Sequence, residues 1–126
     1  MRSAPLCDAY VATPTAHPVA RPRLDDDGQA LTLDLHGATV DEAMRLAEAV
    51  TLQAARYGRA TVRLIHGSST TGAGVRTIKR ALYDALDHGE FDRHVTTSFR
   101  DEDVLRLAIA PSPSPINGRV RLADLY

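Results

Sequence analysis

Apolar residues in the middle of the chain follow two spacings that together predict an α/β domain. Leucines alternate with polar residues over Leu31–Leu35, which is typical of a strand with one buried face. From Thr39 to about Tyr57 the apolar positions recur at helical intervals, which predicts a helix with one buried stripe. Thr39 and Glu42 have the spacing of a capping box, and Gly58 suits the end of this helix.

The same succession of strand and helix follows a second time. A strand is predicted over about Ala60–Ile65 and a helix over about Val75–Asp87. Two further strands, about His94–Phe99 and Val104–Ala110, are joined by a short turn and therefore form an antiparallel hairpin. The order β-α-β-α-β-β predicts a two-layer α/β sandwich with a four-stranded mixed sheet.

Two helices are enough to cover only one face of such a sheet. Alternation places Asp34 and Arg63 on the uncovered face. In the third predicted strand, alternation places Val95, Thr97 and Phe99 on one face. The hydroxyl groups of Thr96 and Ser98 are then on the other face. We expect those hydroxyls on the uncovered face, beside Asp34 and Arg63.

The flanking segments lack this periodicity. Residues 1–30 contain four prolines and predict an extended or disordered arm, in which Asp25–Gly28 forms a turn into the first strand. Residues 31–110 form the predicted domain. Residues 111–126 begin with alternating proline and serine and predict a tail that docks as a short element or stays loose.

Composition places the chain among soluble proteins of one domain. It has 126 residues, of which 44% are hydrophobic and 25% are charged. Its single cysteine, Cys7, excludes an internal disulfide framework. We find no apolar run long enough to span a membrane and no signal-peptide pattern, so we expect a cytoplasmic protein without a membrane partner. The oligomeric state is left open.

Charge is unevenly distributed along the chain. The net charge of -1 gives no overall argument for nucleic acid. However, no acidic residue occurs between Thr51 and Tyr83, where six basic residues fall: Arg56, Arg59, Arg63, Arg76, Lys79 and Arg80. Such a run is usually a solvated face, but this one brackets a glycine-rich loop.

Two His-Gly pairs carry the candidate chemistry. His36 and His66 each end a predicted strand, and each is followed by a glycine and a helix. If the two strands are parallel neighbours, both imidazoles lie at the sheet edge where open α/β sheets bind ligands. Gly72 and Gly74 let the second loop approach an anion near a helix N-terminus.

The ordered set of Leu33–Gly37, Ile65–Gly67, the glycine loop and Ile78–Leu82 resembles the Smr (small MutS-related) domain over about Leu31–Ala110. The resemblance implies a fold like that of the C-terminal domain of translation initiation factor three. It also implies nucleic-acid binding and often endonuclease activity, with DNA nicking or cleavage of mRNA on stalled ribosomes as the known activities.

The motifs of that family map onto individual positions here. Its Asp-x-His motif falls on Asp34 and His36. Its His-Gly-x-Gly loop falls on four residues: His66, Gly67, Gly72 and Gly74. Where many members place a basic residue and a glycine after His-Gly, this chain has Ser68–Thr71, so its loop is longer and less basic.

These residues suit phosphodiester cleavage. His36 is a natural acid or base near neutral pH, Asp34 can orient its imidazole, and His66 is a candidate second proton-transfer group. The predicted phosphate-binding set is Gly67, Gly72, Gly74, Arg76, Lys79 and Arg80. With RNA a 2′-hydroxyl is the nucleophile and no metal is needed. With DNA water attacks, and a divalent ion such as Mg²⁺ helps.

Other interpretations stay open. The chain can be a catalytically silent module that binds RNA, DNA or a ribosome through the Arg56–Arg80 surface. A weaker alternative is a domain that binds a small anion or nucleotide through the glycine loop. In a purely structural interpretation, Asp34 holds the following turn and both histidines are hydrogen-bonded structural residues.

Overall fold

A computed structural model describes residues 21–67, 77–110 and 112–126. The elements follow in the order β1 (Arg23–Asp26), β2 (Ala30–Asp34), α1 (Val40–Arg56), β3 (Thr61–Ile65), α2 (Ile78–Asp87), β4 (Val95–Arg100), β5 (Val104–Ile109) and the 3-10 helix η2 (Leu122–Leu125). Among these residues, neither helix has the length and apolar character that crossing a membrane requires.

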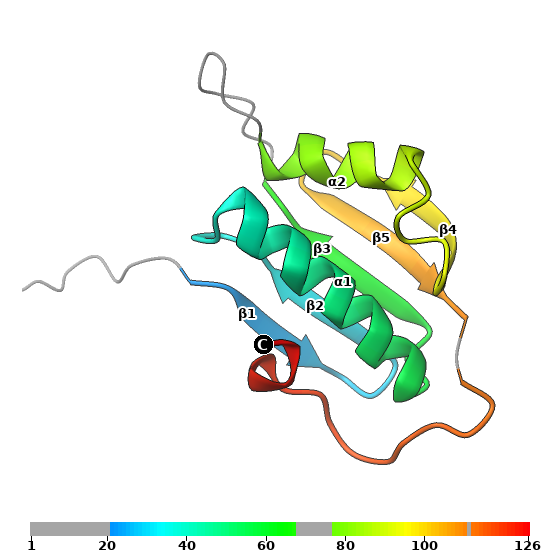
Figure 1. The fold of residues 1–126 in the computed structure, drawn as a ribbon. Helices are drawn as coiled ribbons and strands as arrows, with labels where there is room; N and C mark the ends of the chain where they lie inside the picture. The colour runs from blue at the N-terminus through cyan, green and yellow to red at the C-terminus, as the bar shows by residue number, and fades with distance from the viewer. Residues whose placement is uncertain (1–20, 68–76, 111) are drawn as a thin grey trace, which may run out of the picture.

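The strands form one mixed sheet in the order β1-β2-β3-β5-β4. Only β2 and β3 are parallel neighbours, and the other three pairs are antiparallel. Both α-helices lie on the same side of the sheet (Figure 1). The predicted two-layer α/β class is confirmed, and so are both predicted helices within the described residues. The sheet has five strands, however, and the predicted number of four was wrong.

The additional strand is β1, which lies within the segment expected to be an extended or disordered arm. It pairs antiparallel with β2 through a tight turn at Asp27 and Gly28, where Gly28 has a φ of +94°. The Asp27 carboxylate accepts hydrogen bonds from the backbone amides of Gln29 and Ala30, both at 2.8 Å. With Leu24 as its only apolar residue, this four-residue edge strand gives too short a pattern for alternation to reveal.

The core lies between the sheet and α1. The sheet and the residue directly after β2 contribute six fully buried leucines: Leu31, Leu33, Leu35, Leu64, Leu105 and Leu107. The facing stripe of α1 is built largely from small residues: Ala43, Ala47, Val50, Ala54 and Ala55. Because alanine adds little bulk, the helix axis can approach the leucine layer closely and leave few voids.

The ends of α1 are fixed as the sequence predicts. The Thr39 hydroxyl accepts a hydrogen bond from the Glu42 amide at 3.1 Å, which satisfies one unpaired donor of the first turn. Beyond the last turn, Gly58 has a φ of +73°. A β-carbon at this position would lie 2.8 Å from Cβ of Pro115, so the close approach of the C-terminal segment also requires glycine.

A bulge in β4 changes which face its side chains occupy. The register shifts between Val95 and Thr97. Before the bulge, Val95 lies opposite the buried Ile109, whereas after it Phe99 lies opposite the exposed Arg106. Phe99 is therefore 54% exposed on the face away from the helices. The expectation that Val95 and Phe99 share one face was wrong, because the extra residue reverses the alternation.

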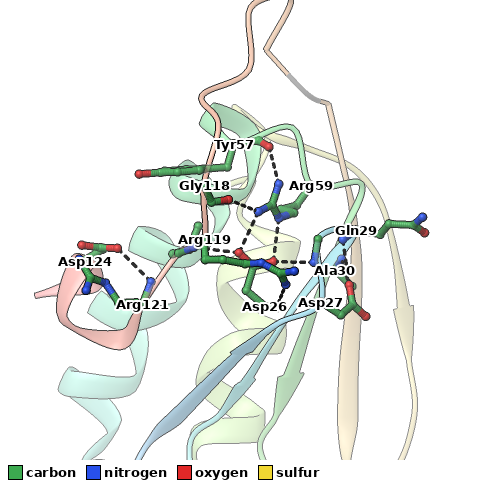
Figure 2. Close-up of polar contacts among 12 residues, drawn as sticks. Asp26, Asp27, Gln29, Ala30, Tyr57, Arg59, Gly118, Arg119, Arg121 and Asp124 are labelled. Atoms are coloured by element: carbon green, nitrogen blue, oxygen red, sulfur yellow. Dashed lines mark hydrogen bonds and ion pairs between the residues drawn. The ribbon is translucent and has the colours of Figure 1, made fainter.

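The C-terminal segment is held to the domain by a buried ion pair between Asp26 of β1 and Arg59, which precedes β3 (Figure 2). Their side chains are 3% and 9% exposed, and two hydrogen bonds of 2.8 and 2.9 Å join them. Arg59 also donates to the carbonyl of Gly118, and the amide of Val120 donates to the Asp26 carboxylate. The tail therefore docks, with Val120 and Leu125 in the core.

Hydrogen bonding outweighs burial in setting the acidity of Asp26. Burial alone raises its pKa, but hydrogen bonds from Arg59, Val120 and Gly28 lower the pKa to about 2. Since an unfolded aspartate titrates near pH 4, the folded state holds the ionised form more strongly than the unfolded chain does. The resulting stabilisation is present above about pH 4 and is lost as the pH falls towards 2.

We predict that Asp26→Ala lowers the free energy of unfolding by about 3–5 kcal/mol, because it leaves the Arg59 guanidinium buried without its partner. Urea denaturation at pH 7 measures this. Asp25→Ala removes the neighbouring carboxylate on the exposed side of β1 and should change stability by less than about 0.5 kcal/mol. Equal effects of the two variants would contradict this account of the ion pair.

Candidate functional site

The ends of β2 and β3 bring the two His-Gly pairs to one edge of the sheet. Asp34 and Ile65 are partners in the parallel register, and the Leu35 amide donates to the Ile65 carbonyl at 2.9 Å. His36 and His66 follow directly, so their backbones leave the sheet side by side. This edge is the one predicted from the sequence.

Asp34 and His36 form a solvent-accessible pair at this edge. One carboxylate oxygen, Oδ1 of Asp34, lies 2.5 Å from Nδ1 of His36 and accepts the His36 backbone amide at 3.0 Å. The two side chains are 27% and 56% exposed, respectively. A proton on Nδ1 facing the carboxylate leaves the lone pair on Nε2, which suits that nitrogen to accept a proton.

The backbone of Gly67 borders the other nitrogen of His36. A β-carbon placed on Gly67 would lie 3.4 Å from Nε2 of His36, and Gly67 has a φ of +78°. The structure thus brings Asp34, His36 and Gly67 together, as the sequence predicts for neighbouring strand ends. Glycine at this position adds no side chain of its own beside Nε2.

His66 points to the opposite side of the sheet from this pair. Its ring packs edge-on against Tyr83 of α2, with centroids 5.9 Å apart, and Nδ1 lies 2.5 Å from the Gly67 carbonyl. Its Nε2 is buried and has no hydrogen-bond partner among the described residues. Within that part of the chain no hydrogen bond or ring contact joins the two imidazoles, so the structure does not bring His66 into the exposed pair.

Burial also sets the protonation of His66. Burial lowers the pKa of its imidazole, and the charge of Lys79 acts in the same direction. The ring is therefore neutral at physiological pH. With its proton on Nδ1 directed at the Gly67 carbonyl, His66 holds the turn that follows β3.

The first amides of this turn already have partners. The backbone N–H groups of His66 and Gly67 both donate to the Asp103 carbonyl, at 2.9 and 3.1 Å. They are therefore not available to hold a phosphate. The predicted phosphate-binding residues Gly72, Gly74 and Arg76 lie outside the described residues, so this part of the site stays a prediction.

The basic residues between 56 and 80 that the structure describes do not form one surface. Arg59 is buried in its ion pair with Asp26, Arg63 lies on the open face of the sheet, and Lys79 and Arg80 belong to α2 on the covered side. In the part of the chain that the structure describes, the predicted Arg56–Arg80 surface is thus divided between the two sides of the sheet.

One cluster near the site was not identified from the sequence. The Tyr83 ring lies under two cations, with the Lys79 ammonium 5.9 Å and the Arg100 guanidinium 4.6 Å from its centroid. The spacing of Lys79 and Tyr83, four residues apart on a helix, indicates their proximity. Arg100 comes from β4, and no local pattern reveals that contact.

Among the residues that the structure describes, no group of three His, Cys, Asp or Glu side chains is arranged to hold a metal ion. The exposed pair offers one carboxylate and one imidazole. The suggestion that a divalent ion assists cleavage of DNA therefore rests on the chemistry of water attack and stays a prediction.

The chain was compared with known families, curated proteins and solved structures. The family model of the Smr domain matches residues 33–104, which is more than half of the chain. No curated protein and no solved structure matches the chain. The matched segment begins just before Asp34 and ends at the start of β5, so it contains both His-Gly pairs and both helices.

We predict that His66 titrates below pH 6.5, the ordinary midpoint of histidine. The charged imidazolium would be buried beside Tyr83 with little water to solvate it, and this lowers the pKa. Proton NMR of the ring Cε1–H measures the midpoint, and Tyr83→Ala should raise it by admitting water. Since the unfolded chain binds the proton more readily, this residue also makes folding less favourable as the pH falls below 6.5. A midpoint at or above 6.5 would show that the ring is hydrated.

Proposed function

Because this chain belongs to the Smr domain family, we propose that it is an endonuclease that cleaves phosphodiester bonds in RNA or nicks DNA. Family membership supports the coarser part of this statement, a nucleic-acid-binding and nuclease-like module. The observation that carries the finer part is the exposed Asp34–His36 pair at the edge of the sheet, with the Nε2 side of the imidazole next to the backbone of Gly67.

RNA is the substrate that this pair suits best. Nε2 of His36 takes the proton of a 2′-hydroxyl, and the 2′-oxygen attacks the adjacent phosphorus. The bond from phosphorus to the 5′-oxygen breaks, and the leaving oxygen takes a proton from water or from a second acid. The products are a 2′,3′-cyclic phosphate and a free 5′-hydroxyl. Asp34 orients the imidazole and stabilises the cation that forms when it gains the proton.

His66 serves this reaction as a positioning residue rather than as the second proton-transfer group. Its buried ring and its contact with the Gly67 carbonyl fix the turn beside Nε2 of His36. DNA has no 2′-hydroxyl, so its cleavage needs an attacking water, which a divalent cation such as Mg²⁺ makes more acidic. The two substrates therefore differ in the product ends and in the expected dependence on Mg²⁺.

A second candidate function is a module that binds nucleic acid or a ribosome without cleaving it. Two observations favour it: the amides of His66 and Gly67 are already bonded to Asp103, and His66 is turned away from the exposed pair. The purified protein incubated with labelled single-stranded RNA, duplex DNA and nicked plasmid, with and without Mg²⁺, separates the two functions. Binding without any product supports the silent module.

We predict that His36→Ala lowers the rate of RNA cleavage by roughly 100- to 10,000-fold, the usual contribution of a general base. Its dissociation constant for the same RNA should change little, because Arg and Lys contacts with phosphates dominate affinity. The matched control is His94→Ala, since His94 precedes β4 at the opposite end of the sheet. If His36→Ala cleaves as fast as the unmodified chain, the proposed chemistry is wrong.

A separate prediction concerns the carboxylate. Asp34→Asn keeps the size of the side chain and a carbonyl oxygen able to accept the Nδ1 proton, but removes the negative charge beside the imidazole. We expect kcat to fall, because the imidazolium that forms during the reaction loses the negative charge that stabilises it, and we expect KM to change little. The comparison is Asp25→Asn on the same open face. A fall in kcat of equal size for both variants would show that the effect comes from the overall charge of the open face and not from the contact between Asp34 and His36.

A further inference from the structure

The face of the sheet away from the helices carries an aromatic ring and neighbouring cations in one row. The registers of β2, β3, β5 and β4 align four residues across the strands: Thr32, Arg63, Arg106 and Phe99. Figure 1 shows that α1 and α2 both lie on the other side of the sheet, so neither of them covers this row. Adjacent strands are about 4.8 Å apart, and consecutive members of the row are therefore close neighbours.

Two features of this row cost free energy unless something binds there. Arg63 and Arg106 are direct cross-strand partners, and like charges in such positions repel each other. Phe99 is a large apolar side chain that is 54% exposed, because the bulge in β4 directs it outwards. An anionic ligand with an apolar surface relieves both costs at once.

The cations of the row are only partly neutralised by the protein. Within the described residues Arg63 forms no ion pair, and its side-chain hydrogen bond is a 3.5 Å contact to the Thr32 hydroxyl. Arg106 lies 3.6 Å from Asp101, but both side chains are about half exposed, so water screens this pair strongly. The guanidinium of Arg106 also lies 5.6 Å from the centre of the Phe99 ring.

Acidic side chains of the same face lie towards its other edge. Asp25 of β1 is opposite Thr32, and Asp34 is in the next row along β2. Arg23 of β1 is the cross-strand partner of Asp34, so the two arginines that face each other, and the aromatic ring, lie over β3, β5 and β4. Thr32, the member of the row on β2, is two residues before Asp34 and on the same face. The row therefore lies next to the edge of the sheet where the Asp34–His36 pair lies.

From this arrangement we infer that the open sheet face binds single-stranded nucleic acid, with a base stacked on Phe99 and phosphates held by Arg63 and Arg106. This inference rests on the proposed function, because it names the form of substrate that reaches His36. A single strand fits because its bases are free to present a flat surface to an aromatic ring, whereas in a duplex they are stacked on one another. The face accepts RNA and DNA single strands alike, since stacking and phosphate contacts do not involve the 2′-hydroxyl.

Binding to the His36→Ala chain tests this inference without cleavage of the probe. Fluorescence anisotropy follows labelled RNA and DNA single strands of about 12 nucleotides, together with a duplex of the same sequence. We expect both single strands to bind more tightly than the duplex. Phe99→Ala should weaken single-strand binding by about 5-fold or more, and Phe99→Tyr should retain it, because tyrosine keeps the stacking surface.

Salt dependence separates the phosphate contacts from the stacked base. Removing Arg63 and Arg106 together should lower the slope of log Kd against log salt concentration by about 1.4, since each phosphate contact of a single strand contributes about 0.7. Phe99→Ala should leave that slope unchanged. Arg93→Ala is the matched control, because Arg93 is exposed before β4 at the opposite end of the sheet.

The outcomes distinguish this inference from the proposed function. If the unmodified chain cleaves RNA but Phe99→Ala and the double arginine variant bind like the parent, the sheet face is not the binding surface and the endonuclease proposal stands. If these two variants bind weakly as expected but no chain cleaves, the face is confirmed and the endonuclease proposal fails. Tighter binding of the duplex, or no binding of any nucleic acid, overturns the inference. Circular dichroism confirms that each variant is folded.

Discussion

The buried pair of Asp26 and Arg59 connects three parts of the chain that are far apart in sequence. Asp26 ends the edge strand β1, Arg59 stands between α1 and β3, and both contact the segment from Gly118 to Val120. Desolvating two charges costs several kcal/mol, and the gain is favourable only with good geometry and additional hydrogen bonds. Here the Asp26 carboxylate accepts from Arg59, Gly28 and Val120, so the polar atoms of the pair are well satisfied.

The strand that this pair anchors also borders the candidate site. β1 pairs with β2 on one side and β3 pairs with it on the other, so Asp34 lies in a strand that has two neighbours. The side chain of Asp34 is then held on the open face while the leucines beside it enter the core. The exposed acid–base pair therefore depends on the strand order as well as on the two residues themselves.

The sequence predicted elements with long, regular patterns and missed features that depend on distant contacts. Both helices and the caps at Thr39 and Gly58 follow from local spacing and were predicted. Strand β1 has one apolar side chain, and its stability comes from partners such as Arg59, so no local pattern reveals it. The outward direction of Phe99 depends on a bulge that alternation cannot show.

The candidate site was predicted in part for the same reason. That His36 and His66 end neighbouring parallel strands could be inferred from the repeated strand–helix order. The side of the sheet that each imidazole ring faces could not be inferred, because the turn after each strand determines the direction of the ring. His36 is held by Asp34 two residues earlier, whereas His66 is drawn towards Tyr83, a contact between separate elements.

The two outer strands of the sheet bear on how this protein avoids aggregation. An unpaired strand edge can recruit another chain through its free backbone groups, and an exposed phenylalanine nearby increases that hazard. On one side the edge strand carries the exposed charges of Arg23 and Asp25, which oppose the docking of a further strand. On the other, the irregularity near Thr97 interrupts the straight run of backbone that such docking requires. The same irregularity that exposes Phe99 therefore also protects the molecule from the self-association that an exposed ring invites.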